Sequence, residues 1–303
     1  MLTFRVGKIP VRVHPSFFLM SAMLGLSDRN LAAIVAWVSI VFASVLLHEL
    51  GHAMAGRAFG LEPRIDLHTM GGTTSWSTSH PLSTAKRVAI SLAGPFVGFA
   101  LAAFVRFGLG PNAFPHFDFV YQNLLYVNFF WGVLNLLPML PLDGGNVMAQ
   151  LLNAATSGRG ERPARIVSIA FAAMAIALAL FVGNWWGGLL AFTFIGANWR
   201  GLKELADREH DAPLRESLEK AYAALDAKDA ERVLALARPV ALGSSTAPVR
   251  AEALQLLAFG FLLEGRLADA DAAIAALPKE FAPHPSLLEL RASRVAGTPD
   301  RSA

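Results

Sequence analysis

Residues 38–52 read VSIVFASVLLHELGH, an uncharged apolar run that closes on the pattern HELGH at residues 48–52. On a helix, a spacing of four residues places the imidazoles of His48 and His52 on one side, close enough to share a metal ion. Glu49 lies within reach of a metal-bound water as a general base. Such groups in an apolar span are costly unless they are paired or bind a metal, so the stretch predicts a membrane helix with a Zn²⁺ site. The alternative is a pair of interfacial histidines without a metal.

The whole chain is poor in charge. Of its 303 residues, 16% are charged and 54% are hydrophobic, whereas an ordinary soluble domain is about 25% charged. This balance excludes a disordered chain and a collagen-like fibre. Several uncharged runs reach the ~18 residues that mark a membrane-spanning helix, and the longest predicts two helices with a turn at Gly183-Asn184. We expect an all-α polytopic membrane protein with about six spans, at residues 17–26, 30–59, 81–107, 117–140 and twice within 166–199.

The positive charges select one orientation for these spans. With the N-terminus in the cytoplasm, nearly every lysine and arginine of the membrane part falls on the inner side, as the positive-inside rule requires. Only Arg29 and Arg106 fall outside. We therefore expect both termini in the cytoplasm of a bacterial cell, and the inner-side residues are Arg5, Lys8, Arg12, Arg57, Arg64, Lys86, Arg87, Arg159, Arg162, Arg165, Arg200 and Lys203.

The tail differs from the membrane part. Residues 1–202 hold 13 Lys/Arg against 7 Asp/Glu, whereas residues 203–303 hold 13 against 16. We expect two domains with these bounds, the second a small α-helical domain of roughly two hairpin repeats. The apolar positions of one expected helix pair resemble a tetratricopeptide repeat, and an unrelated helical bundle is the alternative. Those positions are Leu254, Leu257, Phe261, Ala270, Ile274 and Leu277.

A catalytic zinc needs a third protein ligand and an open position for water. The chain has no cysteine, so the ligand atoms must be nitrogen or oxygen. Asp143 stands out because Pro138, Pro141 and two glycines break the chain around it at membrane depth, which is tolerated where backbone lines a watered cavity. Asp143 could also be the N-cap of a helix over residues 146–153. The full set of candidates downstream is Glu62, Asp66, His68, His80, His116, Asp118, Asp143 and Glu161.

The HExxH pattern and the later segment NxxPxxxLDGG, residues 135–145, together resemble the site-2 protease family of intramembrane zinc metalloproteases. The resemblance covers about residues 10–200. It implies that one Zn²⁺ is bound by His48, His52 and Asp143. It further implies that Glu49 is the catalytic base and that Asn135 touches the substrate backbone or the oxyanion.

Shorter segments resemble the same family. Gly71-Gly72 is similar to its membrane-associated hairpin after the HExxH helix, and Ala93-Gly94-Pro95 is similar to a further segment. Gly98 departs from the pattern, because many members have asparagine there. This departure concerns helix packing more than metal ligation.

The resemblance implies proteolysis of peptide bonds within or near transmembrane segments, in a multi-pass protein of the bacterial cytoplasmic membrane. The expected partners are the lipid bilayer, a transmembrane substrate such as an anti-sigma factor or another membrane-tethered regulator, and a protein or second copy that binds the C-terminal domain. No nucleic acid is expected. Two other classes remain open: a non-proteolytic membrane scaffold that presents the tail for peptide binding, and a zinc transporter.

Overall fold

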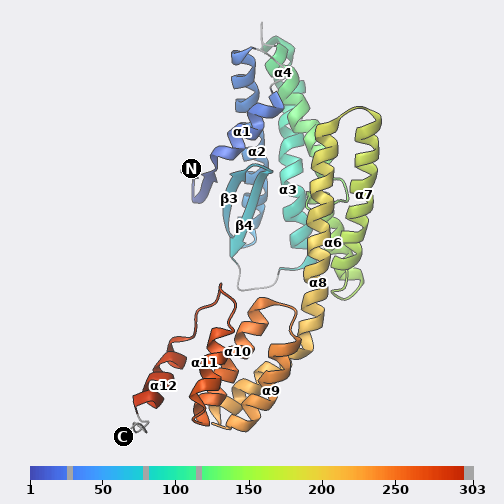
Figure 1. Ribbon diagram of the computed structural model, residues 1–303. Helices are drawn as coiled ribbons and strands as arrows, with labels where there is room; N and C mark the ends of the chain where they lie inside the picture. The colour runs from blue at the N-terminus through green and yellow to red at the C-terminus, as the bar shows by residue number, and fades with distance from the viewer. Residues whose placement is uncertain (26–29, 78–81, 114–117, 297–303) are drawn as a thin grey trace. The chain divides into compact units, whose positions relative to one another are not determined.

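The structure of the chain is a computed structural model that describes residues 1–25, 30–77, 82–113 and 118–296. The chain divides into two compact units, Met1–Arg200 and Gly201–Ala303. The first unit holds a small sheet and the apolar helices, and the second is helical (Figure 1).

The sheet of the first unit has four strands in the order β1-β2-β3-β4. They are β1 (Leu2–Val6), β2 (Ile9–Val13), β3 (Glu62–His68) and β4 (Gly71–Ser77). The expected hairpin at Gly71-Gly72 is present as β3 and β4, which lie beside α2 (Figure 1). Sequence reasoning missed the N-terminal hairpin, whose strand β2 pairs in parallel with β3.

This sheet forms because apolar side chains alternate along β2 and β3 and so fall on one face. Val11 and Val13 are opposite Ile65 and Leu67 in the parallel register, and all four are buried. They pack against one face of the second helix of the chain. The sheet therefore holds the HExxH helix and the β3–β4 hairpin in one core.

The helices of the first unit follow the apolar runs. Asn30 is the N-cap of the second helix, and its side chain accepts a hydrogen bond from the Ala32 N–H. Two π-helical turns, Phe104–Leu109 and Tyr126–Phe130, extend the third helix and join the fourth to the fifth, and a short 3₁₀ turn covers Pro111–Ala113. The helices are α1 (Pro15–Gly25), α2 (Leu31–Ala58), α3 (Thr84–Ala103), α4 (Asp118–Leu125), α5 (Trp131–Asn135), α6 (Asp143–Ala155), α7 (Glu161–Phe181) and α8 (Trp185–Asp226).

Within the described residues, three helices are long and apolar enough to cross a membrane: Leu31–Ala58, Thr84–Leu109 and Glu161–Phe181. The chain is a multi-pass membrane protein. The expected first span is the shorter apolar helix α1, and the expected fourth and sixth spans lie in α4–α5 and in the start of α8. The number of six spans stays a prediction.

The second unit is built from the later part of α8 and four further helices, α9 (Ala230–Gly243), α10 (Ala247–Leu263), α11 (Leu267–Ala275) and α12 (Pro285–Ala296). Its core is a cluster of small and aliphatic side chains that includes Val233, Val249, Leu256 and Leu262. The unit is helical, as expected from the sequence, and its assignment to tetratricopeptide repeats stays a prediction.

Candidate metal centre

His48 and His52 lie one turn apart on α2 and face each other across 3.1 Å, measured between their Nε2 atoms. His52 is buried and its Nδ1 lies 2.7 Å from the Ile90 carbonyl oxygen. A carbonyl oxygen only accepts, so Nδ1 carries the proton and Nε2 presents a free lone pair. The backbone of α3 thus fixes the tautomer in which His52 can ligate a metal.

Asp143 comes to the same point from α6. One of its carboxylate oxygens lies 3.1 Å from His48 Nε2, and the other lies 3.4 Å from His52 Nε2. The N-cap alternative for Asp143 is wrong, because α6 begins at Asp143 itself and its N-cap is Leu142. The carboxylate therefore faces the histidines.

The two glycines after Asp143 allow the start of α6 to pack closely against the preceding loop, residues 136–142. A Cβ on Gly144 would lie 2.1 Å from the Leu136 carbonyl oxygen, and one on Gly145 would lie 2.3 Å from the Leu140 nitrogen. The first turn of α6 thus packs directly against the backbone of the preceding loop. Any larger residue would push Asp143 away from the histidines.

The donor atoms of these three residues are spaced for a zinc ion. Zn²⁺ binds nitrogen at about 2.0–2.1 Å in tetrahedral sites, which places any two ligand atoms about 3.3 Å apart. The two histidine nitrogens lie 3.1 Å apart, and each has one of the two Asp143 carboxylate oxygens at 3.1 or 3.4 Å, close to that edge length. Two neutral imidazoles and one carboxylate are a donor set for a catalytic zinc, which leaves one position for water.

Glu49 stands beside this set with its own partner. It is 5% exposed, and its carboxylate lies within the group in which ligand atoms of His48, Glu49 and His52 approach within 4.8 Å of one another. The Thr74 hydroxyl of β4 lies 2.6 Å from Glu49 Oε2 and 3.1 Å from the Glu49 carbonyl oxygen. Glu49 is thus held next to the histidines by the hairpin.

Three glycines let backbone approach the centre. A Cβ on Gly72 of β4 would lie 2.4 Å from Glu49 Cγ, and one on Gly94 of α3 would lie 2.3 Å from His52 Nε2. Between the histidines, a Cβ on Gly51 would lie 2.7 Å from the Ala93 carbonyl oxygen, which explains the glycine within HELGH. The site is therefore walled by the bare backbone of β4 and α3.

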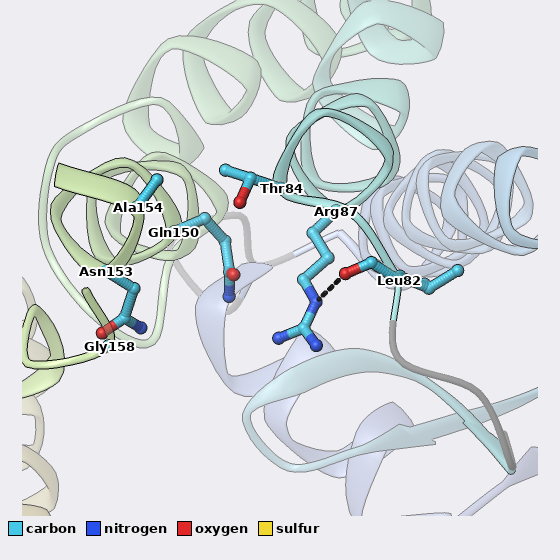
Figure 2. Close-up of a pocket in the computed structure, with 7 residues that line it drawn as sticks. All are labelled: Leu82, Thr84, Arg87, Gln150, Asn153, Ala154 and Gly158. Atoms are coloured by element: carbon cyan, nitrogen blue, oxygen red, sulfur yellow. Dashed lines mark hydrogen bonds between the residues drawn. The ribbon is translucent and has the colours of Figure 1, made fainter.

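The centre opens into a cavity of about 820 Å³. His48, Glu49, His52 and Asp143 line it, together with Asn135 at the end of α5 and the strand residues 71–74. Asn135 therefore shares the cavity with the three ligand candidates and the candidate base. A smaller polar pocket of about 310 Å³ lies between the start of α3 and the end of α6 (Figure 2). Its lining residues include Arg87, Gln150 and Asn153.

The other candidates for the third ligand have different surroundings. His68 lines the cavity, but its Nε2 lies 2.9 Å from the Thr73 hydroxyl. Glu161 forms an ion pair with Arg165 at 2.7 Å. Glu62 and Asp66 lie on β3, and Asp118 starts α4. No ion pair or hydrogen bond to His48 or His52 is found for these three within the described chain, in contrast to Asp143. His80 and His116 lie outside the described residues.

Known proteins are similar to this chain in sequence and in fold. Residues 110–181, which include Asn135 and Asp143, match Peptidase family M50. Zinc metalloprotease MJ0392 of Methanocaldococcus jannaschii is 29% identical over 158 residues, covering 50% of this chain and 44% of that protein. Stage IV sporulation protein FB of Bacillus subtilis is 29% identical over 151 residues, covering 48% of each chain. The chain is therefore similar to Peptidase family M50, the site-2 protease family.

The family resemblance drawn from HExxH and NxxPxxxLDGG is thereby confirmed. Among solved structures, the site-2 protease from Methanocaldococcus jannaschii superposes with a TM-score of 0.50 at 23% identity, covering 66% of this chain and 94% of that one. At that identity the likeness concerns the site-2 protease fold. The chain spans about half the length of the two curated relatives named above.

Sequence reasoning missed several contacts of the centre. Thr74 could have been found from strand alternation, because Gly72, Thr74 and Trp76 share one face of β4. Gly94 was noted only as a family segment, without its contact to His52. The Ile90 carbonyl left no signal in the sequence, because any residue offers the same oxygen.

Proposed function

We propose that this chain is an intramembrane zinc metalloprotease that hydrolyses peptide bonds within or near transmembrane segments of membrane-tethered regulatory proteins. The observation that carries the proposal is the Asp143 carboxylate, whose two oxygens lie 3.1 Å from His48 Nε2 and 3.4 Å from His52 Nε2. The Glu49 carboxylate is close to the same histidines but accepts a hydrogen bond from Thr74. We therefore separate three ligand candidates from one candidate base. A scaffold has no need of that separation.

In this proposal His48, His52 and Asp143 hold one zinc ion per chain. When bound there, zinc would supply a Lewis acid that activates water and polarises a peptide carbonyl. Glu49 takes the proton of the attacking water at its carboxylate and delivers it to the leaving amine. Asn135 donates from its side-chain amide to the substrate backbone or to the developing oxyanion.

The substrate must be unwound before attack, because a membrane helix hides its amides in its own hydrogen bonds. Strand β4 is last in the sheet order, so no described strand pairs with its outer edge. Its residues line the cavity beside Glu49. An extended substrate segment can add to this edge, where backbone bonds give affinity without fixing the sequence.

The proposal also covers the membrane topology, the location in the cell and the two domains. The HExxH pattern lies toward the end of α2 that carries Arg57, which the positive-inside rule places in the cytoplasm. We therefore propose six spans in a bacterial cytoplasmic membrane, both termini inside, and release of the product inward. Residues 1–202 form the protease domain, and residues 203–303 form a tetratricopeptide-like domain that binds a partner or a second copy. Neither binds nucleic acid.

Comparison of purified protein with its Glu49→Gln variant tests the function. We expect cleavage of an unstable transmembrane segment by the native protein only, with equal zinc content in both. A scaffold would cleave nothing in either form. A zinc transporter would move zinc into vesicles without proteolysis, although the ligand candidates here cluster at one point and do not follow a path. The inactive Glu49→Gln form should also retain bound substrate during purification.

A further inference from the structure

The loop that delivers Asp143 is held at one residue, Leu140, by two buried polar side chains from other helices. Ser168 of α7 accepts a hydrogen bond from the Leu140 N–H at 2.8 Å. Asn198 of α8 donates one from its side-chain amide to the Leu140 carbonyl oxygen at 2.8 Å. Both backbone polar groups of Leu140, which belong to its two flanking peptide groups, are thus bound by side chains, three residues before Asp143.

Both side chains are fully enclosed. Ser168 is 0% exposed and Asn198 is 1% exposed. Around them, Met139 and Leu142 of the loop pack on Phe171 and Ala172 of α7 and on Phe194 of α8. Hydrogen bonds in such an apolar setting are stronger and more directional than bonds in water, and a buried amide is costly without them.

The side-chain amide of Asn198 has only one orientation that suits its surroundings. Its amide nitrogen donates to the Leu140 and Phe194 carbonyl oxygens, at 2.8 and 2.9 Å. Its Oδ1 has no hydrogen-bond partner within the described part of the chain. Turning the amide over would set that oxygen against two carbonyl oxygens, so the geometry fixes Asn198 as a donor.

We propose that Ser168 and Asn198 are positioning residues of the metal centre: by clamping the backbone of Leu140 on both sides, they set the place of Asp143 as the third ligand. The inference rests on the proposed function. It extends the centre beyond the two motifs, because helices that carry no ligand then determine how well the zinc is held. Partners of this kind around ligands typically change metal affinity by about 10–100-fold.

The test measures zinc affinity by competition with a chelator on the full-length protein in detergent. We expect Asn198→Leu, which keeps the volume and removes both bonds, and Ser168→Ala to bind zinc about 10-fold more weakly or worse. Matched controls remove only a local bond to the carbonyl four residues earlier. They are Asn123→Leu, which loses its bond to Phe119, and Ser39→Ala, which loses its bond to Val35. Both controls should bind zinc as the native protein does.

A double-mutant cycle separates positioning from general damage. In an Asp143→Ala background, Asn198→Leu should change zinc affinity by less than about twofold, because the residue through which it acts is gone. An undiminished loss in that background would overturn the inference, as would native affinity in both clamp variants. If Asn198→Leu does not fold, the zinc affinity of Ser168→Ala tests the inference by itself, because this substitution removes only one oxygen atom and disturbs the packing least. Absence of zinc binding by the native protein would instead refute the proposed function.

Discussion

The Thr74 hydroxyl donates a hydrogen bond to the Glu49 carboxylate, with 2.6 Å between the two oxygens. The strand with the open edge therefore also carries the group that orients the candidate base. A substrate that pairs with β4 would meet Glu49 already aimed at the ligand set.

Thr74→Val is expected to lower kcat by about 10- to 100-fold and to leave zinc content unchanged, because it removes one hydrogen bond to a charged group. Thr74→Ser should restore most of the rate, since it keeps the hydroxyl. Ser75→Ala, which removes a hydroxyl from the opposite face of β4 and does not line the cavity, is the control. A fully active Thr74→Val enzyme would show that the bond has no part in the chemistry.

Asp143→Ala is expected to bind zinc at least about 100-fold more weakly than the native protein. Loss of a residue that only hydrogen-bonds a metal ligand already lowers metal affinity by about 10–100-fold, and loss of a ligand should cost more. Asp66→Asn, a candidate on β3, should keep native zinc content. Metal analysis of the two purified proteins makes the comparison. If the two variants lost zinc equally, or if Asp143→Ala kept it, Asp143 would not be the third ligand.

Gly94→Ala is expected to abolish zinc binding, because the added Cβ would lie 2.3 Å from His52 Nε2 and 2.7 Å from His48 Nε2. Gly196→Ala is the control, since a Cβ there meets no atom within 4 Å. Both are helical positions, so the change in helix propensity is the same. Equal zinc content in the two variants would place the metal elsewhere.

The second unit contains a buried carboxylate that predicts a pH dependence. Asp211 is 1% exposed. Burial by itself raises its pKa, but hydrogen bonds from the Thr246 hydroxyl and from the backbone N–H groups of Ser245 and Thr246 outweigh that effect and lower the pKa below 3.8. Its ionised form therefore stabilises the fold above about pH 4, and this contribution is lost as the pH falls through the lowered pKa.

Asp211→Asn should cost about 1–3 kcal/mol at pH 7, and the difference from the native protein should shrink as the pH is lowered below 4. Hydrogen exchange at the Ser245 and Thr246 amides measures this in the full-length protein. The exposed Glu219→Gln on the same helix should change stability by less than about 0.5 kcal/mol. A constant difference across the pH range would contradict the assignment.

Removal of the tail after Lys203 should leave zinc binding and cleavage of an unstable transmembrane segment intact while selectivity or regulation is lost. All four residues of the centre belong to the unit Met1–Arg200. Zinc analysis and a cleavage assay with matched substrates measure the two effects. A truncated protein that folds and binds zinc but cleaves nothing would place the tail in the catalytic unit.

Much of the centre could be predicted from the sequence because its strongest signal is local. Helix periodicity alone places His48 and His52 on one side. Asp143 was one of eight candidates by its residue type, and it stood out through the prolines and glycines around it and through the family resemblance, because no periodicity links residues on different helices. Ser168 and Asn198 could not be predicted, since a serine or asparagine in an apolar helix does not reveal which peptide it will bind.

The sheet illustrates the same limit. The β3–β4 hairpin was expected from the family resemblance at Gly71-Gly72, and its two strands and their turn are contiguous in the sequence. Strand β2 pairs with β3 across the whole of α1 and α2. Pairing at that distance depends on how the helices between them pack, which strand propensity does not encode.

Asp143 follows His48 by 95 residues. A growing chain is made from its N-terminus, so the helix with both histidines and Glu49 exists before the third ligand has been synthesised. Until then the nascent protein carries the candidate base Glu49 and only two of the three ligand candidates. If the proposed function holds, assembly of the centre is therefore a late step of biogenesis, because an unfinished chain lacks the third ligand candidate.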